Sequence, residues 1–307
     1  MTIKLFLLTG VLLFNFCKCG TKNSNATDQA YGHAVQDKSF VLYNLSKPSQ
    51  VWNLPESLKE VSGIGWVDSN HCLFIEDLHP DLYLVRLEKQ GIIEKKIVFA
   101  QQSDRKFDVE DVAIAGNKAY ALWSHGAIYQ IDNWNSKPTV RRWETGLSKA
   151  NDTEGLCFDP VSNDLLIACK NESSDEGQKK STRAVYRFDL SSGKLKENPF
   201  LLVYKKDLKQ KESEVSNFYP SAIAIHPQTH DLYILSTKET KAMAVYSYDG
   251  KLKSFQFIDK ELMPQPEGLC FSPEGDLYIS TEGKHGKQPK VLKFQPLKII
   301  RESKRNA

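Results

Sequence analysis

The chain has 307 residues, of which 40% are hydrophobic and 26% are charged, and its formal net charge is +3 at pH 7. Its mean hydropathy of −0.44 excludes a protein that crosses a membrane many times. The 41 basic and 38 acidic residues are spread along the chain without a dense basic block, so we expect no nucleic-acid partner. The composition predicts a globular body with a large apolar core, and we expect a monomer.

The first residues of the chain differ from the rest. Lys4 precedes an apolar run over residues 5–16, which is too short for a settled membrane span and ends abruptly in polar residues. This pattern predicts an export signal over residues 1–19. We therefore expect the protein to lie outside the cytoplasm, in the periplasm or at the outer or inner membrane.

Cys17 lies where the apolar run ends, at the place of the lipid-accepting cysteine in a bacterial lipoprotein signal. A polar stretch follows over residues 20–38 and predicts a flexible tether. Together these features predict membrane anchorage through a lipidated Cys17. Export without lipidation is the alternative, because Asn15 and Phe16 replace the small residues that usually precede the acceptor.

Further along the chain, one pattern recurs five times. Each copy has a small or acidic residue, a small residue and an apolar run, and a second apolar segment follows after a polar turn. The five copies are Val61–Val67, Val109–Ile114, Thr153–Pro160, Pro220–Pro227 and Pro266–Pro273. With the strand-like segments that follow each copy, four strands recur about every 45–50 residues, without a helical period of useful length. Such a repeat is typical of a β-propeller.

We predict an all-β fold, a single β-propeller over residues 39–297 with five four-stranded blades. The last repeat is one strand short, and a strand within residues 50–54 is expected to supply it, which closes the ring and leaves no open sheet edge. A basic C-terminal tail is expected over residues 298–307. Six blades are the alternative, because the long connection over residues 205–217 leaves room for a degenerate blade.

The cysteines within the repeats are predicted to be unpaired. They are Cys72, Cys157, Cys169 and Cys270. Cys157 and Cys270 occupy the same place in different repeats and therefore lie apart, and a hairpin turning at residues 160–164 puts Cys157 opposite Leu166 rather than Cys169. We expect these cysteines to be small buried residues of strands.

Acidic residues recur where the chain enters the first strand of a repeat. Because these strands line the central channel and side chains two apart point the same way, we expect the acids to converge on one mouth of the channel. The six predicted positions are Glu60, Asp108, Glu110, Asp152, Glu154 and Glu267. The fourth repeat departs from the pattern, with Tyr219 and Ser221 in the corresponding places.

The loops between second and third strands are expected to open on the same face and to form a ligand-binding rim. The predicted rim residues are Glu76, Asp77, His125, Asn171, Glu239 and Glu282. Oxygen ligands without a thiolate or a paired-histidine motif suit Ca²⁺ better than Zn²⁺, so we predict Ca²⁺ at the mouth. The alternative is that these carboxylates cap backbone amides at blade junctions or pair with neighbouring lysines and arginines.

The familiar catalytic motifs are missing from the sequence. It contains no Gly-x-Ser-x-Gly elbow, no His-Glu-x-x-His pair and no Cys-x-x-Cys metal pair. His125 is a candidate acid, base or ligand, but no nucleophile can be paired with it from the sequence. The catalytic residues, if the protein is an enzyme, are therefore unknown.

Four stretches resemble the SdiA-regulated family of exported bacterial β-propeller proteins, and the likeness runs from about Ser39 to Phe294. They are Tyr43–Ile64, Asp108–Ala113, Ser124–Gly126 and Asn151–Gly155. The resemblance implies a periplasmic or envelope-anchored propeller that is distantly phytase-like and is linked in some members to calcium. It implies no established reaction. The same six acidic positions are the ones that the resemblance carries over.

Three functions are compatible with this sequence. We prefer a binding protein whose acidic mouth holds Ca²⁺ and whose rim meets a protein or small-molecule ligand. The second is a Ca²⁺-dependent hydrolase, either a phytase-like phosphoesterase or a lactonase. A phosphoesterase needs cationic side chains at the mouth to neutralise phosphate, and the candidates are Lys170, Lys238, Lys284 and Lys287. The third is a metal-free scaffold for protein interaction.

Overall fold

The computed structural model describes residues 39–101, 107–171, 181–284 and 286–301. The predicted export signal, its Cys17 and the predicted tether lie outside the described residues, as does the end of the predicted basic tail. Within the described ranges, no helix is both long enough and apolar enough to cross a membrane.

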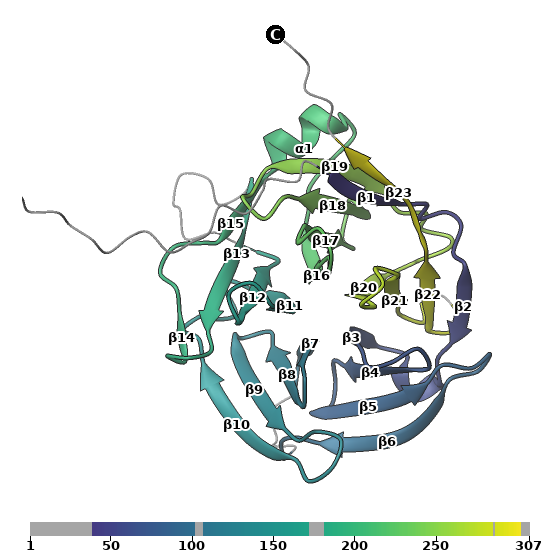
Figure 1. The fold of residues 1–307 in the computed structure, drawn as a ribbon, viewed down its shortest axis with the longest axis vertical. Helices are drawn as coiled ribbons and strands as arrows, with labels where there is room; N and C mark the ends of the chain where they lie inside the picture. The colour runs from purple at the N-terminus through teal and green to yellow at the C-terminus, as the bar shows by residue number, and fades with distance from the viewer. Residues whose placement is uncertain (1–38, 102–106, 172–180, 285, 302–307) are drawn as a thin grey trace, which may run out of the picture. The chain divides into compact units, whose positions relative to one another are not determined.

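Five antiparallel sheets are arranged around a central channel as the blades of a propeller (Figure 1). Blade 1 consists of β3 (Val61–Trp66), β4 (His71–Glu76), β5 (Asp81–Arg86) and β6 (Ile92–Val98). Blade 2 consists of β7 (Val109–Ala115), β8 (Lys118–Trp123), β9 (Ala127–Asp132) and β10 (Thr139–Glu144). The predicted all-β fold with five blades is confirmed.

The remaining blades follow the same order from the channel outward. Blade 3 consists of β11 (Thr153–Asp159), β12 (Asp164–Cys169), β13 (Thr182–Asp189) and a divided outer strand, β14 (Lys194–Leu195) with β15 (Leu201–Tyr204). Blade 4 consists of β16 (Pro220–Ile225), β17 (Leu232–Ser236), β18 (Ala242–Tyr246) and β19 (Leu252–Phe257). Blade 5 consists of β20 (Pro266–Phe271), β21 (Leu277–Thr281), β22 (Lys290–Phe294) and β2 (Gln50–Asn53).

The ring is closed by β2, which pairs with β22 as the outer strand of blade 5. This confirms the predicted closure by an N-terminal strand. A 3₁₀ helix (Glu56–Leu58) then leads into blade 1. The long connection between blades 3 and 4 holds the helix α1 (Lys205–Lys211) rather than a degenerate blade, so the six-blade alternative is not adopted.

A second closure, which the sequence did not suggest, joins the two ends of the described chain. β1 (Ser39–Tyr43) pairs with β23 (Pro296–Arg301) in a separate two-stranded sheet. The boundary expected at residue 297 therefore falls inside β23. The hydroxyl of Tyr43 donates to the carbonyl of Gly275 at 2.5 Å, which fastens this sheet to blade 5.

Each inner strand bears a β-bulge at its second residue. Counting from the first residue of each inner strand, the pairing register shifts between positions 1 and 3 in all five blades. The residue at position 2 has no partner across the ladder, so its side chain is redirected out of the sheet. Position 2 is occupied by Ser62, Glu110, Glu154, Ser221 and Glu267.

Position 3 explains the glycines of the repeated Glu-Gly-Leu sequence. A Cβ on Gly155 would lie 2.9 Å from the backbone nitrogen of Ile223 in blade 4, and one on Gly268 would lie 2.9 Å from the backbone nitrogen of Ile64 in blade 1. Glycine thus lets neighbouring inner strands approach closely around the channel. Blade 2 has Asp111 there instead, and its buried carboxylate accepts a hydrogen bond from the backbone N–H of Leu156 in blade 3 at 2.8 Å.

The cysteines are small residues at packed positions. Cys157 and Cys270 stand at position 5 of their strands, where the other blades have Gly65, Ala113 and Ala224. All four described cysteines are free, as predicted. Cys157 pairs with Leu166 across the hairpin, which confirms the predicted register.

Candidate functional site: the acidic mouth of the channel

Three glutamates from position 2 mark one mouth of the channel: Glu110, Glu154 and Glu267. Two serines complete the ring of five. Ser62 donates to the carbonyl of Val109 at 2.8 Å, and Ser221 donates to the carbonyl of Pro266 at 3.1 Å. Each serine therefore fastens its blade to the next one, and only the three glutamates are left to act on a ligand.

The glutamates are held in a poorly solvated environment. Glu154 and Glu267 each expose only 7% of their surface. Burial, with the neighbouring charge of Glu154, raises the pKa of Glu267 to about 8. Burial and the charges of Glu154 and Asp108 also raise the pKa of Glu110 well above its ordinary value. With a pKa of about 8, the carboxyl of Glu267 therefore holds a proton at neutral pH unless a cation compensates it.

One lysine enters this group. Lys170 follows β12, and its Nζ lies 2.6 Å from Oε1 of Glu154. Burial alone would lower the pKa of Lys170, but the charge of Glu154 outweighs it and the pKa is raised. Lys170 thus neutralises one of the three inner glutamates. Neither Glu110 nor Glu267 forms an ion pair with any other described residue.

A second charged group lies beside the first. Nζ of Lys284 lies 3.1 Å from Glu60 and 2.7 Å from Glu282. Glu282 also accepts a hydrogen bond from Nε2 of Gln265 at 2.7 Å. Burial raises the pKa of Glu282, and the charge of Glu60 contributes in the same direction. The predicted position Glu60 therefore belongs to an ion-pair network at the mouth.

Asp108 and Asp152 hold the loops that surround the mouth. The carboxylate of Asp108 accepts a hydrogen bond from Oγ of Ser124 at 2.8 Å. The backbone carbonyl of Asp152 accepts from the N–H of Lys170 at 2.7 Å, and Asp152 itself has a left-handed backbone with φ of 54°. The charge of Asp152 contributes to the raised pKa of Glu154, so it lies within electrostatic reach of the glutamates.

The predicted rim is only partly assembled. Asp77 lies close enough to Glu282 for its charge to raise the pKa of that carboxyl. Glu76 is turned inward, where it bonds to His79 and to the N–H of Leu78. Glu239 is exposed and accepts a hydrogen bond from Asn217 at 2.7 Å.

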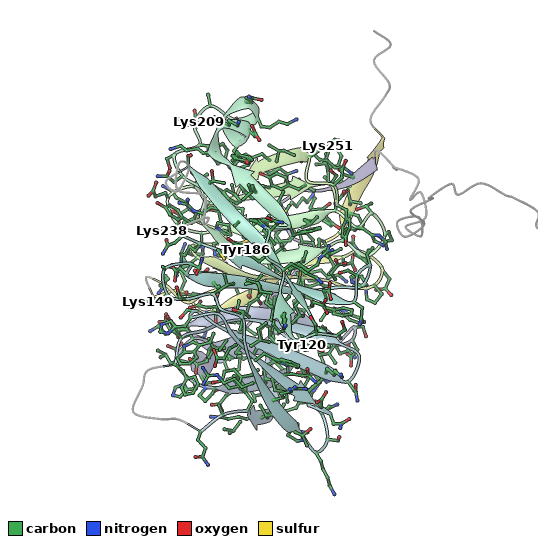
Figure 2. All side chains as sticks on the ribbon, turned by 90° about the vertical axis from the view of Figure 1, so that its left-hand side faces the viewer. Tyr120, Lys149, Tyr186, Lys209, Lys238 and Lys251 are labelled. Atoms are coloured by element: carbon green, nitrogen blue, oxygen red, sulfur yellow. The ribbon has the colours of Figure 1, made fainter. Side chains whose placement is uncertain are left out.

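Two further rim residues have structural contacts of their own. His125 stacks on Trp123 with ring centroids 5.1 Å apart and an interplanar angle of 10°. The backbone N–H of Asn171 donates to the carbonyl of Asn151 at 3.1 Å. In the side view of Figure 2, Lys149 and Lys238 lie along the left edge of the ring, and Lys251 lies farther to the right.

The sequence reasoning missed one cation at this end. Nζ of Lys241 donates to the carbonyl of Thr237 at 2.7 Å. Burial lowers the pKa of Lys241, and the charges of Glu267 and Glu282 oppose that shift. Lys241 therefore lies within electrostatic reach of both glutamates. Its only signal in the sequence was its place two residues beyond Glu239, in a loop predicted to open on the mouth.

As placed, the acids form an electrostatic cluster and not a closed coordination sphere. Among the described residues, no three Asp, Glu, His or Cys side chains lie close enough together to hold a metal ion. With pKa values raised to about 7 and about 8, Glu154 and Glu267 can exchange protons near neutral pH.

Comparison with solved structures bears on the fold. The glutaminyl cyclase of Myxococcus xanthus matches with a TM-score of 0.56 at 9% identity, over 83% of this chain and 97% of that one. The PQQ-bound aldose sugar dehydrogenase of Streptomyces coelicolor matches with a TM-score of 0.52 at 11% identity, over 85% of this chain and 99% of that one. At such identities the likeness shows the propeller architecture alone.

Comparison of the sequence itself is more specific. No curated protein matches the chain. A family model described as SdiA-regulated matches residues 39–284, which is more than half of the chain and spans the inner strands of all five blades. The protein therefore belongs to the SdiA-regulated family.

Proposed function

We propose that this protein is an exported, envelope-tethered binding propeller that captures a cation, Ca²⁺, at its acidic mouth. The observation that carries the proposal is the state of Glu267. Its side chain is 7% exposed, and it forms no ion pair with another described residue. A buried carboxylate without a counter-charge is costly, and a bound cation would remove that cost.

Charge balance supports a cation rather than an anion. The charge of Glu154 contributes to the raised pKa of both Glu110 and Glu267, and of the three glutamates only Glu154 has an ion-pair partner, Lys170. Carboxylate oxygens are the ligands that Ca²⁺ prefers. The three carboxylates do not lie close enough together to share one metal ion. Binding of Ca²⁺ therefore requires the glutamate side chains to turn toward the ion.

The arrangement of the lysines favours binding over phosphate-ester hydrolysis. Of the four candidate phosphate ligands, Lys170 is paired with Glu154 at 2.6 Å and Lys284 with Glu282 at 2.7 Å. Lys287 lies 3.1 Å from Glu261, and Lys238 lies over a tyrosine ring. Three of these four lysines are already paired with a carboxylate, which leaves less positive charge among them for a phosphate.

Tethering is supported by the N-terminal sequence. The apolar run over residues 5–16 followed by Cys17 has the order of a lipoprotein signal, and the polar residues 20–38 could span the distance from a membrane to the ring. We expect metabolic labelling with an alkyne fatty acid to mark the parent protein and a Cys19→Ser control but not Cys17→Ser. Equal labelling of Cys17→Ser would contradict the anchor.

The cation site is tested by thermal unfolding of the purified residues 39–307 with and without Ca²⁺ at constant ionic strength. At about 100 times the Kd, a cation stabilises the folded state by about 2.7 kcal/mol. We expect Ca²⁺ to raise the unfolding temperature of the parent, and Glu267→Gln and Glu154→Gln to lose that increase.

Glu274→Gln provides the matched control, because Glu274 is exposed in a turn at the opposite end of blade 5. It should respond to Ca²⁺ as the parent does. If the parent shows no increase, or if both mouth variants keep it in full, no functional Ca²⁺ site exists at the mouth.

A further inference from the structure

The end of the channel opposite the acidic mouth is an apolar cavity of about 560 Å³. Position 6 of every inner strand contributes one large apolar side chain to its wall. These residues are Trp66, Ile114, Phe158, Ile225 and Phe271. Each of the five is partly exposed. We call this cavity the apolar cup.

The lining of the apolar cup carries no charge. The remaining wall residues are small, apolar or hydroxylic, and they include Trp134 and the turn residues Pro160, Pro227 and Pro273. The acidic position 2 lies four residues away along each strand, or about 13 Å. The two ends of the channel are therefore chemically separate surfaces.

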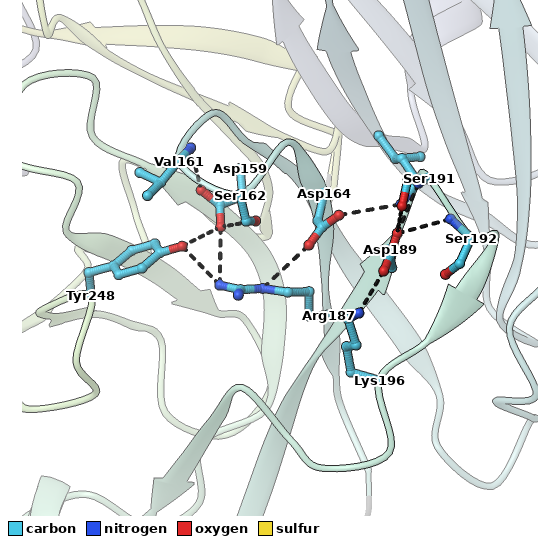
Figure 3. A network of polar contacts seen from close by, with 11 residues as sticks. Asp159, Val161, Ser162, Asp164, Arg187, Asp189, Ser191, Ser192, Lys196 and Tyr248 are labelled. Atoms are coloured by element: carbon cyan, nitrogen blue, oxygen red, sulfur yellow. Dashed lines mark hydrogen bonds and ion pairs between the residues drawn. The ribbon is translucent and has the colours of Figure 1, made fainter. Parts of the chain in front are cut away.

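Charged groups at the edge of the apolar cup are held by one another. Asp159, which follows Phe158, accepts hydrogen bonds from Arg187 at 3.2 Å and from the hydroxyl of Tyr248 at 2.6 Å (Figure 3). Ser162 donates to the same carboxylate at 2.7 Å. Because the charges of Asp159 and Arg187 are paired with each other, these two groups offer no uncompensated charge to a molecule in the cavity.

In blade 4 the polar residue at the edge of the apolar cup also has its partners within the protein. His226 follows Ile225 and is fully buried, with its Nε2 3.1 Å from the hydroxyl of Tyr43. Its Nδ1 accepts hydrogen bonds from the N–H groups of Gln228 and Thr229 at 3.3 and 3.2 Å. Burial lowers the pKa of His226 to about 4, so this edge of the cup is also uncharged at neutral pH.

We propose that the apolar cup is a binding site for a small uncharged molecule with a planar apolar ring. Its volume lies within the range of about 300–1,000 Å³ that is usual for small-molecule sites. Trp66, Phe158 and Phe271 offer aromatic surface against which such a ring packs. An anionic or cationic ligand would be buried there without a counter-charge.

A matched pair of fluorescent probes tests the chemical class. N-phenyl-1-naphthylamine is neutral, and 8-anilino-1-naphthalenesulfonate has the same ring system with a sulfonate. We expect the neutral probe to saturate one site on residues 39–307 and to bind at least about tenfold more tightly than the anionic probe. Absence of saturable binding by the neutral probe, or equal affinity for both, overturns the proposal.

Two substitutions of different kinds test the location. Ile225→Arg brings a charge into the apolar cup, and Ile114→Trp fills part of its volume. Each substitution is expected to weaken binding of the neutral probe at least about tenfold. Val140→Arg on the outer strand β10, where Val140 is 44% exposed, is the control and should bind as the parent does.

Unfolding curves establish that each variant is folded, and using two variants keeps the test decisive if one of them is not. Unaltered binding by a folded Ile225→Arg or a folded Ile114→Trp places the probe elsewhere and overturns the assignment.

Discussion

The acidic mouth and the apolar cup are built from the same five inner strands, yet their chemistry is opposite. Position 2 lies in a β-bulge and has no cross-strand partner, so a glutamate there can leave the sheet and face the channel. Position 6 lies in the regular ladder, as in the pairs Phe158 with Leu165 and Phe271 with Leu277. The glutamates that face the channel thus stand where the ladder is broken, and the large apolar side chains stand where it is regular.

A substitution at position 3 of the inner strands, which lies between the acidic mouth and the apolar cup, is expected to destabilise the whole ring. Gly155→Val would put side-chain atoms against the backbone of Ala222 and Ile223 in the next blade. We expect a loss of about 3 kcal/mol in the free energy of unfolding, because backbone cannot give way as a side chain can. Denaturant unfolding measures it. A loss below about 1 kcal/mol would show that the blades are not in such close contact.

The next prediction concerns the pH dependence of stability that Glu267 causes at the mouth. The pKa of Glu267 is about 8 in the folded protein against an ordinary 4.5, so folding takes up a proton in this range and stability falls as pH rises from 4.5 to 8. Glu267→Gln removes this loss. We expect its stability relative to the parent to increase by up to about 1.4 kcal/mol per pH unit between those values.

Unfolding of parent and Glu267→Gln at pH 5, 6, 7 and 8 checks this prediction. Ca²⁺ should reduce the difference, since it compensates the carboxylate of the parent. A difference that does not change with pH would mean that Glu267 ionises like an exposed acid.

The opposite end should respond to pH with the opposite sign. His226 has a pKa of about 4 in the folded state against an ordinary 6.5, so the unfolded chain binds more protons between these values and stability falls as pH decreases through them. His226→Asn should lose up to about 1.4 kcal/mol per pH unit less than the parent over pH 6.5 to 4. An equal loss of stability in the parent and in His226→Asn would refute the low pKa of His226.

The smallest effect is expected at the serines that replace glutamate in the ring. Ser62→Ala removes the hydrogen bond to Val109 and leaves a buried carbonyl without it, at a cost of about 1 kcal/mol. Because Ser62 fastens blades and does not face a ligand, the variant should keep the Ca²⁺ response of the parent. Loss of that response in a folded Ser62→Ala would extend the site beyond the glutamates.

Much of the fold followed from sequence repetition. The five copies of the inner-strand pattern, with four strands about every 45–50 residues, predicted five blades, and the missing strand of the last repeat predicted closure by β2. The pairing of β1 with β23 was not predictable in this way, because it joins segments outside the repeats. Helix α1 was missed because its six polar and charged residues and one buried leucine give little helical period.

For the candidate site, the sequence by itself determined where acids enter the channel wall, because position in a repeat sets position in the ring. Only the tertiary structure decided which acids remain uncompensated. Lys284 reaches Glu60 across 224 residues of sequence, and Ser221 is turned onto the backbone of blade 5. Such contacts depend on which blades become neighbours when the ring closes, and so does the apolar cup, whose five walls meet only in the closed propeller.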